Sequence, residues 1–315
     1  MAQDLVSILI PCHNAAPWVS QTLESALVQT WPHKQIIVVD DGSTDESAKI
    51  IRSYAGHGVH LFTQENRGAA AARNRALREA RGDFFQFLDA DDLISPEKIS
   101  AQVRLLSGRP AGAVASCAWG RFTDDPAAAR FVDDAVYRDF AALDFLLLAA
   151  QTGAMMHPSS WLVPRAVAEH AGPWDETLTL NDDGEYFCRV LLASSGLAFT
   201  SGVRSYYRSG LPGSLSQRRD ERSRRSQFHS IELIERHLLA AEDSPRTRRA
   251  CADYYQRFVH DFFPFPGELM RRAEKRVAEL GGSDFDRPVM GPKTAALARC
   301  LGWKNVRRLK HWLSR

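Results

Sequence analysis

Three carboxylates in four residues are the most chemically distinctive feature of this sequence. Asp89, Asp91 and Asp92 follow the apolar run Phe84–Leu88. Adjacent carboxylates repel one another, so such a cluster is costly unless a cation or hydrogen-bond donors neutralise it. Oxygen ligands of this kind suit Mg²⁺ or Mn²⁺, which commonly bridge to substrate phosphates. A solvated acidic turn followed by a helix cap at Ser95 accounts equally well for the same residues.

A second acidic pair, Asp40 and Asp41, ends another apolar run and precedes Gly42. The glycine permits a tight turn, and one of the residues 43–45 can cap the next helix. A turn does not require two adjacent carboxylates. One of the pair can therefore accept hydrogen bonds from a ribose or a base.

An arginine and a third acidic pair complete the candidates. Arg73 follows the loop Asn66-Arg67-Gly68, and an arginine beside a carboxylate-rich cleft can bind phosphate or a base. A solvated helix face would also explain it. Asp182 and Asp183 begin a predicted helix, where the helix dipole favours carboxylates. The alternative is that one of them stays ionised and accepts a proton from an attacking hydroxyl.

Alternating strands and helices carry these residues in the first half of the chain. The strands are expected at Leu5–Ile10, Gln35–Asp40, Val59–Thr63 and Phe84–Leu88, and the helices at 17–29, 43–53 and 69–80. Runs that are apolar on both faces and alternate with helices predict a parallel sheet covered on both sides. Ligands bind beyond the carboxyl ends of such strands, which here carry His13-Asn14, Asp40-Asp41 and Asp89–Asp92.

The second half of the chain is less regular and then becomes helical. We expect helices at 138–150 and 183–194, a strand at 199–207, and a strand or loop at 157–163. Amphipathic helices are expected at 222–241, 245–261, 267–280 and 293–314. The net charge of +2 conceals −7 over residues 1–216 and +9 over 217–315. We therefore predict a domain at 1–216 and a basic helical extension at 217–315.

Several classes of protein are disfavoured. The sequence has no GxGxxG, GxxxxGK[ST], GxSxG or HExxH motif, and nucleic-acid binding is not expected. The five cysteines are scattered, which is typical of reduced thiols in a cytosolic protein. The longest mostly apolar stretch, Phe140–Ala150, is too short to span a membrane, so a cytoplasmic location is expected.

Five segments in a consistent order resemble the family 2 glycosyltransferases: VSILIPCHNAAPWVSQTLESALVQT, IIVVDDGSTD, ENRGAAAARNRAL, FFQFLDADD and NDDGEYFCRV. The resemblance covers about residues 5–216. It implies a GT-A fold, a Rossmann-like, mostly parallel sheet with helices on both faces. It also implies an inverting transfer of sugar from a nucleotide-diphosphate donor to a saccharide or lipid-linked acceptor, assisted by Mn²⁺ or Mg²⁺. Cell-surface polysaccharide or glycolipid synthesis is the implied role.

The resemblance also assigns roles to individual residues. Asp183 would be the catalytic base, and Asp91 the principal metal ligand, with Asp89 nearer the ribose or the metal's waters. The donor would contact Pro11, His13, Asn14, Asp40, Asp41, Arg73, Asp89 and Arg208, with residues 209–217 as a flexible lid. The acceptor would contact His157, Trp174 and Asp182, and Trp161 or Trp174 could stack on a sugar ring. Asp182 stands where glutamate is commoner, and the histidine that many relatives carry after Tyr-Arg is absent.

Two other functions stay open. A sugar-phosphate nucleotidyltransferase would use a similar sheet, but its glycine-rich loop is missing from Pro11–Ala16. A non-catalytic nucleotide-sugar-binding protein is the second alternative. Residues 288–315 contain seven Lys or Arg and no acid, with Trp303 and Trp312 beside an apolar stripe. Residues 290–315 therefore either contact the inner face of a membrane or pack on the body of the protein.

Overall fold

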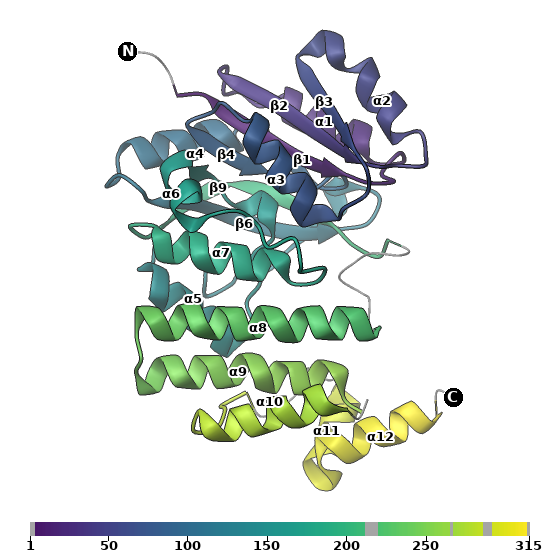
Figure 1. The fold of residues 1–315 in the computed structure, drawn as a ribbon, viewed down its shortest axis with the longest axis vertical. Coiled ribbons are helices and arrows are strands. Elements are labelled where there is room, and N and C mark those ends of the chain that lie inside the picture. The colour runs from purple at the N-terminus through teal and green to yellow at the C-terminus, as the bar shows by residue number, and fades with distance from the viewer. Residues whose placement is uncertain (1–3, 212–219, 265–266, 286–291, 314–315) are drawn as a thin grey trace. The chain divides into compact units, whose positions relative to one another are not determined.

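The computed structural model describes residues 4–211, 220–264, 267–285 and 292–313 (Figure 1). The chain divides into two compact units. The first comprises Met1–Phe145 and Met155–Gln217, and the second comprises Leu146–Ala154 and Arg218–Arg315. The boundary predicted near 216 and most of the predicted lid at 209–217 lie outside the described residues.

The larger sheet of the first unit has the strand order β3-β2-β1-β4-β8. The strands are β1 (Val6–Cys12), β2 (Lys34–Asp41), β3 (Val59–Gln64), β4 (Phe84–Phe87) and β8 (Val163–Pro164). The first four run parallel, and β8 pairs with β4 in the antiparallel direction. The predicted parallel sheet is therefore confirmed, and the carboxyl ends of β1, β2 and β4 meet at one edge.

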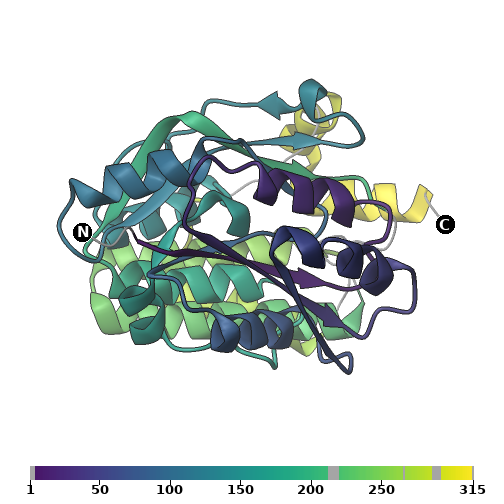
Figure 2. The ribbon, with the colours of Figure 1, turned by 90° about the horizontal axis from the view of Figure 1, so that it is seen from above.

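Helices cover both faces of this sheet, as its apolar strands require. One face packs Ile8, Ile10 and Val38 against residues from α1 (Val19–Leu27), α2 (Ser47–Ser53) and α4 (Lys98–Ser107). Helix α3 (Ala69–Glu79) packs along β1 and β2 on the other face, and Figure 2 shows α1 and α3 on opposite sides of the strands. Each fully buried aliphatic side chain contributes about 1.5–3 kcal/mol to folding.

A second, four-stranded sheet has the order β5-β9-β6-β7. Its strands are β5 (Leu93–Ile94), β6 (Val114–Phe122), β7 (Arg130–Phe131) and β9 (Leu197–Arg208). The long strands β6 and β9 run parallel, with a register shift between Cys117 and Ala118. Strand β9 was predicted, but β6 was not, because small residues interrupt its β-branched and aromatic signal.

The remaining helices of the described chain complete the first unit and build the second. They are α5 (Ala142–Thr152), α6 (Arg165–Ala171), α7 (Asp182–Ala193), α8 (Glu221–Ala241), α9 (Pro245–Phe262), α10 (Glu268–Glu279), α11 (Pro292–Leu301) and α12 (Trp303–Leu313). Short 3-10 turns occupy Ala55–His57, Pro126–Ala128 and Pro158–Ser160. The segment 157–163 thus contains a 3-10 turn at Pro158–Ser160 and ends at the first residue of β8, Val163.

The second unit is a set of packed helices. Asp220 caps α8 and Ser244 caps α9 through side-chain oxygens that accept backbone N–H bonds. Tyr255 donates a 2.6 Å hydrogen bond to Glu235, which joins α9 to α8. The prediction of one helix over 293–314 is wrong, because Gly302 has a left-handed φ of 76° and separates α11 from α12.

Within the ranges that the structure describes, we find no helix both long and apolar enough to cross a membrane. The five cysteines are free thiols, as expected from their spacing.

Candidate active site

The turn after β2 is held by Asp41. Its two carboxylate oxygens accept hydrogen bonds from the backbone N–H groups of Arg67 (3.0 Å) and Gly68 (2.8 Å), and one also accepts from Gln64. Asp40 is also buried, but its Oδ1 has no hydrogen-bond partner among the described residues. A buried carboxylate oxygen without a partner is costly. Of these two carboxylates, Asp40 is therefore the one with an oxygen that no described residue binds, and that oxygen is enclosed by the protein in this structure.

The segment after β1 reaches the same turn. Asn14 has a left-handed φ of 51°, and its side-chain oxygen accepts a hydrogen bond from Thr44 N at 2.8 Å. His13 Nδ1 lies 2.9 Å from Asp41 O. Both side chains are exposed, whereas Pro11 lies within β1 and is buried. His13 and Asn14 can thus contact a ligand at this edge, but Pro11 contributes only to the strand.

The carboxylate turn after β4 divides its residues between surface and interior. Asp89 and Asp91 are partly exposed, while Asp92 is fully buried. Burial and the charges of Asp92 and Asp89 raise the pKa of Asp91 to about 8. Burial, together with Asp89, also raises the pKa of Asp92. The cluster is thus strongly self-repelling without a counter-charge, and a cation at Asp91 would relieve that repulsion.

These carboxylates fit a hard divalent cation shared with a ligand. Among the residues that the structure describes, no three His, Cys, Asp or Glu side chains surround one point as a complete metal site. Mg²⁺ and Mn²⁺ sites on nucleotide substrates typically use one or two carboxylates, with phosphate oxygens and water as the other ligands. Asp91 and Asp89 match that partial set.

Arg73 lies between the two predicted halves of the site. Its Nη2 donates to Asp89 at 2.7 Å and its Nη1 donates to Asp182 at 2.8 Å, while its guanidinium lies 4.5 Å from the centre of the Trp174 ring. Burial by itself would lower the pKa of Arg73, but the two carboxylates raise it overall. The guanidinium is therefore already engaged by protein carboxylates. It joins α3, the turn after β4 and the start of α7.

Asp183 occupies the first turn of α7, as predicted. Its Oδ1 accepts a hydrogen bond from Gly184 N at 2.9 Å. Asn181, the residue before α7, adopts a left-handed conformation with a φ of 60°. The helix therefore begins at Asp182. Burial and the neighbouring Asp182 raise the pKa of Asp183 to about 6. A carboxylate with that pKa is ionised at neutral pH yet basic enough to accept a proton from a hydroxyl.

Four predicted contacts are corrected by the burial of their side chains. His157 and Trp174 are each 2% exposed, so neither side chain can touch an acceptor in this structure. Trp174 stacks on Tyr186 at 4.0 Å, and Trp161 is also buried. Arg208 is buried too, and it donates to Asp91 O (2.9 Å), Thr123 O and Gln21. It supports the carboxylate turn instead of presenting a free charge to phosphate.

Asp92 anchors a buried polar network that the motifs did not reveal. Asp92 Oδ1 accepts from Arg208 N at 2.9 Å, and Oδ2 lies 3.1 Å from His157 Nδ1 and 3.2 Å from Ser159 Oγ. His157 Nε2 in turn lies 3.0 Å from Ser205 Oγ. Burial lowers the pKa of His157 to about 3, so the ring is neutral. This network fixes the carboxylate turn after β4 to β9. In the sequence, the only sign of this network is that Asp92 directly follows Asp91 in the carboxylate cluster.

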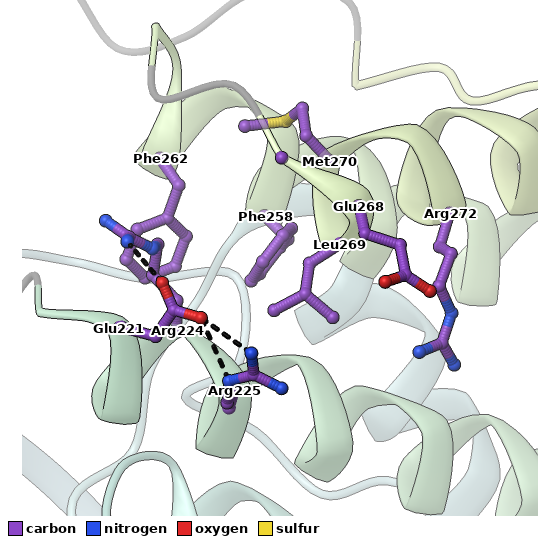
Figure 3. Close-up of a pocket in the computed structure, with 10 residues that line it drawn as sticks. Glu221, Arg224, Arg225, Phe258, Phe262, Glu268, Leu269, Met270 and Arg272 are labelled. Atoms are coloured by element: carbon purple, nitrogen blue, oxygen red, sulfur yellow. Dashed lines mark hydrogen bonds and ion pairs between the residues drawn. The ribbon is translucent and has the colours of Figure 1, made fainter.

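A separate pocket of about 220 Å³ lies within the second unit (Figure 3). Its apolar wall includes Phe258, Phe262 and Leu269. Two of the arginines that line it, Arg224 and Arg225, form ion pairs with Glu221 of the same helix, α8 (Figure 3). The pocket thus offers apolar surface with paired charges, and none of the predicted site residues line it.

The chain is similar in sequence to known proteins. A model of the family described as Glycosyl transferase family 2 matches residues 7–166, slightly more than half of the chain. An uncharacterized glycosyltransferase of Rickettsia typhi is 31% identical over 192 residues, which are 61% of this chain and 60% of that protein. A putative teichuronic acid biosynthesis glycosyltransferase, TuaG of Bacillus subtilis, is 39% identical over 108 residues, 33% of this chain and 43% of that protein. The chain thus spans 60% or less of these curated relatives.

Solved structures resemble the chain over a larger share of its length. Staphylococcus aureus TarS 1–349 in complex with UDP-GlcNAc gives a TM-score of 0.64 at 16% identity, covering 95% of this chain and 92% of that one. The mannosyltransferase PcManGT of Pyrobaculum calidifontis, in complex with GDP-Man and Mn²⁺, gives 0.57 at 17% identity, covering 100% and 84%. At these identities the likeness shows the fold, which is the predicted one.

Proposed function

Because this chain belongs to glycosyltransferase family 2, we propose that it transfers a sugar from a nucleotide-diphosphate donor to an acceptor hydroxyl with inversion at the anomeric carbon. The observation that carries the proposal is the double ion pair of Arg73 with Asp89 and Asp182. It holds the proposed donor side, at the turn after β4, next to the proposed base, Asp183. An attacking oxygen and a leaving diphosphate need this proximity.

Each residue then has a defined task. His13, Asn14 and the free oxygen of Asp40 bind the nucleoside at the ends of β1 and β2. Asp183 accepts the proton of the acceptor hydroxyl as its oxygen attacks the anomeric carbon, opposite the departing diphosphate. Arg73 orients Asp182 and Asp89 through its two ion pairs, and Arg208 holds the backbone of Asp91. Asp91 and Asp89 would hold Mn²⁺ or Mg²⁺, which supplies positive charge to the diphosphate.

The donor is proposed to be a sugar nucleotide of UDP or GDP. UDP-GlcNAc is the ligand of the TarS structure, and GDP-Man with Mn²⁺ that of the mannosyltransferase. A thermal-shift screen of nucleotide diphosphates and nucleotide sugars, with Mn²⁺ and with EDTA, tests this point. Ligand at about 100 times its Kd adds about 2.7 kcal/mol to stability. We expect the nucleotides of one base, uridine or guanosine, to stabilise the protein when Mn²⁺ is present and not in EDTA. If no nucleotide stabilises the protein, the proposal is contradicted.

A saccharide or lipid-linked saccharide is the proposed acceptor, in the synthesis of a cell-surface polysaccharide or glycolipid. The name of the Bacillus subtilis relative, which refers to teichuronic acid biosynthesis, supports this role. A nucleotidyltransferase would instead release pyrophosphate from a nucleoside triphosphate and a sugar phosphate. A non-catalytic protein would bind the donor and release no nucleotide. Assays of nucleotide and pyrophosphate release separate the three functions.

We also propose that residues 1–216 form the catalytic domain and that the helices near the C-terminus contact an anionic membrane. Leu301 and Trp312 are 50% and 73% exposed, and Leu297 and Leu309 are also exposed. Lys304 and Arg308 are exposed on α12, whereas Val306 is buried. An exposed apolar stripe with flanking cations suits the surface of an anionic bilayer.

A further inference from the structure

An exposed arginine lies over two aromatic rings near the carboxyl ends of β6 and β9. The guanidinium carbon of Arg121 is 5.1 Å from the centre of the Trp119 ring and 5.1 Å from that of Tyr207. The rings themselves meet edge to face at 6.0 Å. Arg121 forms no ion pair with any residue that the structure describes. This contrasts with Arg73, whose charge is shared by two carboxylates.

The two rings are fixed in place. Trp119 Nε1 donates a 2.8 Å hydrogen bond to Met155 O, which sets the orientation of the indole. The buried ring of His157 packs against both, at 5.4 Å from Trp119 and 5.5 Å from Tyr207. Arg121 and Tyr207 are register partners on the paired strands. The half-buried rings therefore form a rigid support for the arginine.

This support is joined directly to the proposed donor site. His157 Nδ1 lies 3.1 Å from Asp92, the buried member of the carboxylate turn. Arg208, the residue after Tyr207, donates to Asp92 through its backbone N and to Asp91 O through its Nε, both at 2.9 Å. The aromatic pair is thus one contact away from the turn that would hold the donor's diphosphate.

The chemistry of the arrangement suits an anion. A guanidinium presents a planar fork that matches carboxylate or phosphate, and contact with aromatic faces holds it without neutralising it. Residues 1–216 carry a net charge of −7, which would repel an anionic substrate. An unpaired arginine is the group that could offset this repulsion locally. The adjoining ring surfaces can pack against the apolar C–H faces of a sugar.

We propose that Arg121, Trp119 and Tyr207 form a subsite for an acceptor saccharide that carries a carboxylate or a phosphate. Arg121 binds the anionic group, and the two rings pack against the sugar that bears it. This inference rests on the proposed function, because it takes the neighbouring turn to be the donor site.

Binding of defined probes to the full chain tests the subsite. The probes are p-nitrophenyl β-glucuronide for a carboxylate, glucose 6-phosphate for a phosphate, and p-nitrophenyl β-glucoside as the neutral sugar. Affinities are measured by ligand-observed NMR titration, with and without Mn²⁺ and UDP or GDP. We expect at least one anionic probe to bind the wild type about tenfold or more tightly than the neutral probe, the gain of a charge-assisted bidentate contact.

Two substitutions of the same kind locate the effect. Arg121→Gln should remove the preference for the anionic probe and leave the affinity for the neutral probe within about twofold. Arg204→Gln is the matched control, since Arg204 is also exposed, lies on β9 and stacks over an aromatic ring, that of Phe131, at 4.4 Å. It should leave both affinities unchanged. Trp119→Leu should weaken both probes, and melting temperatures confirm that each variant is folded.

The outcomes separate this inference from the proposed function. If no anionic probe is preferred by the wild type, or if Arg121→Gln keeps the preference, the subsite is refuted. If the preference follows Arg121 but no nucleotide binds with Mn²⁺, the anion site stands while the glycosyltransferase proposal fails. If Arg204→Gln has the same effect as Arg121→Gln, the preference reflects general surface charge and the subsite is again refuted.

Discussion

Arg73 Nη1 donates a 2.8 Å hydrogen bond to Asp182 Oδ2, across 109 residues of sequence. The second nitrogen of the same guanidinium, Nη2, binds Asp89 at 2.7 Å. Helix α3 therefore connects the turn after β4 to the first turn of α7 through one buried cation. Removing one partner of such a buried pair leaves the other charge unpaired, which costs far more than an exposed pair contributes.

Arg73→Gln should therefore destabilise the protein by about 3 kcal/mol, because Asp89 and Asp182 would lose their shared cation. The loss is measured as the change in the free energy of unfolding of the first unit in urea. Arg75→Gln is the control, since Arg75 pairs with Glu79 one turn along α3 and is 40% exposed. It should cost less than about 1 kcal/mol. Equal losses of stability in the two variants would show that the buried ion pairs of Arg73 stabilise the protein no more than an exposed ion pair does.

Asp91→Asn should abolish the Mn²⁺-dependent part of nucleotide diphosphate binding. The amide removes the proposed ligand charge but keeps the size of the side chain. Isothermal titration of UDP or GDP, with Mn²⁺ and with EDTA, measures the effect, and a loss of about tenfold or more in affinity is expected. The exposed Asp133 provides the control variant Asp133→Asn. Unchanged affinity in Asp91→Asn would remove Asp91 as a metal ligand.

Asp183→Asn should lose sugar transfer while keeping donor binding, because the amide cannot accept the acceptor's proton. Release of nucleotide from the donor, with and without acceptor, gives the first measurement, and titration calorimetry gives the second. Retained transfer would exclude Asp183 as the base. Lost donor binding would instead indicate that the start of α7 had been disturbed.

The same variant should be more stable than the wild type near neutral pH. Burial and Asp182 raise the pKa of Asp183 to about 6, above the usual range for an aspartate. The raised pKa means that the folded state holds its proton longer, so this contribution is present at low pH and is lost as pH rises through about 6. Asp183→Asn should thus gain on the order of 1–3 kcal/mol relative to wild type at about pH 8, and less at about pH 4. Unfolding in guanidinium at the two pH values gives the free energies of the variant and the wild type. If their difference is the same at both pH values, the raised pKa of Asp183 is contradicted.

The pH dependence of transfer should report the same acidic pair. The rate should rise with pH as Asp182 and Asp183 ionise, with an apparent pKa near 6 at saturating Mn²⁺. Asp182→Asn removes the neighbouring charge that raises the pKa of Asp183, so its profile should shift to lower pH. A profile that is flat from about pH 5 to 8 in the wild type would argue against a carboxylate base.

Flotation with liposomes tests the proposed membrane contact. The full chain should partition with vesicles that contain phosphatidylglycerol, and less with phosphatidylcholine alone or in high salt. Truncation of residues 290–315, or Leu309→Ser with Trp312→Ser, should reduce partitioning. Val132→Ser is the control, since Val132 is as exposed as Trp312, at 73%, but lies in the first unit. Unchanged partitioning after truncation would refute the contact.

Local sequence predicted strands β1 to β4, the helices between them and the edge at which the polar residues gather. Runs such as Gln35–Asp40 are apolar on both faces and end in carboxylates, and that pattern depends only on neighbouring residues. The match to β2 (Lys34–Asp41) and the placement of Asp183 in the first turn of α7 follow from it. Local patterns failed where the signal was weak, at β6, and where one glycine interrupted a periodic stretch, at Gly302.

Only the tertiary structure decided what the candidate side chains touch. Arg73 was expected to contact the donor, but the tertiary structure pairs it with Asp89 of the turn after β4 and with Asp182 of α7. His157 was expected to meet an acceptor, but it lies in the interior against Asp92, 65 residues away. The reason is that periodicity and turn signals report neighbours along the chain, whereas burial and long-range ion pairs depend on which elements meet. The sequence thus determined which groups are available for chemistry, and the packing of α3, α7 and β9 determined which of them are free to perform it.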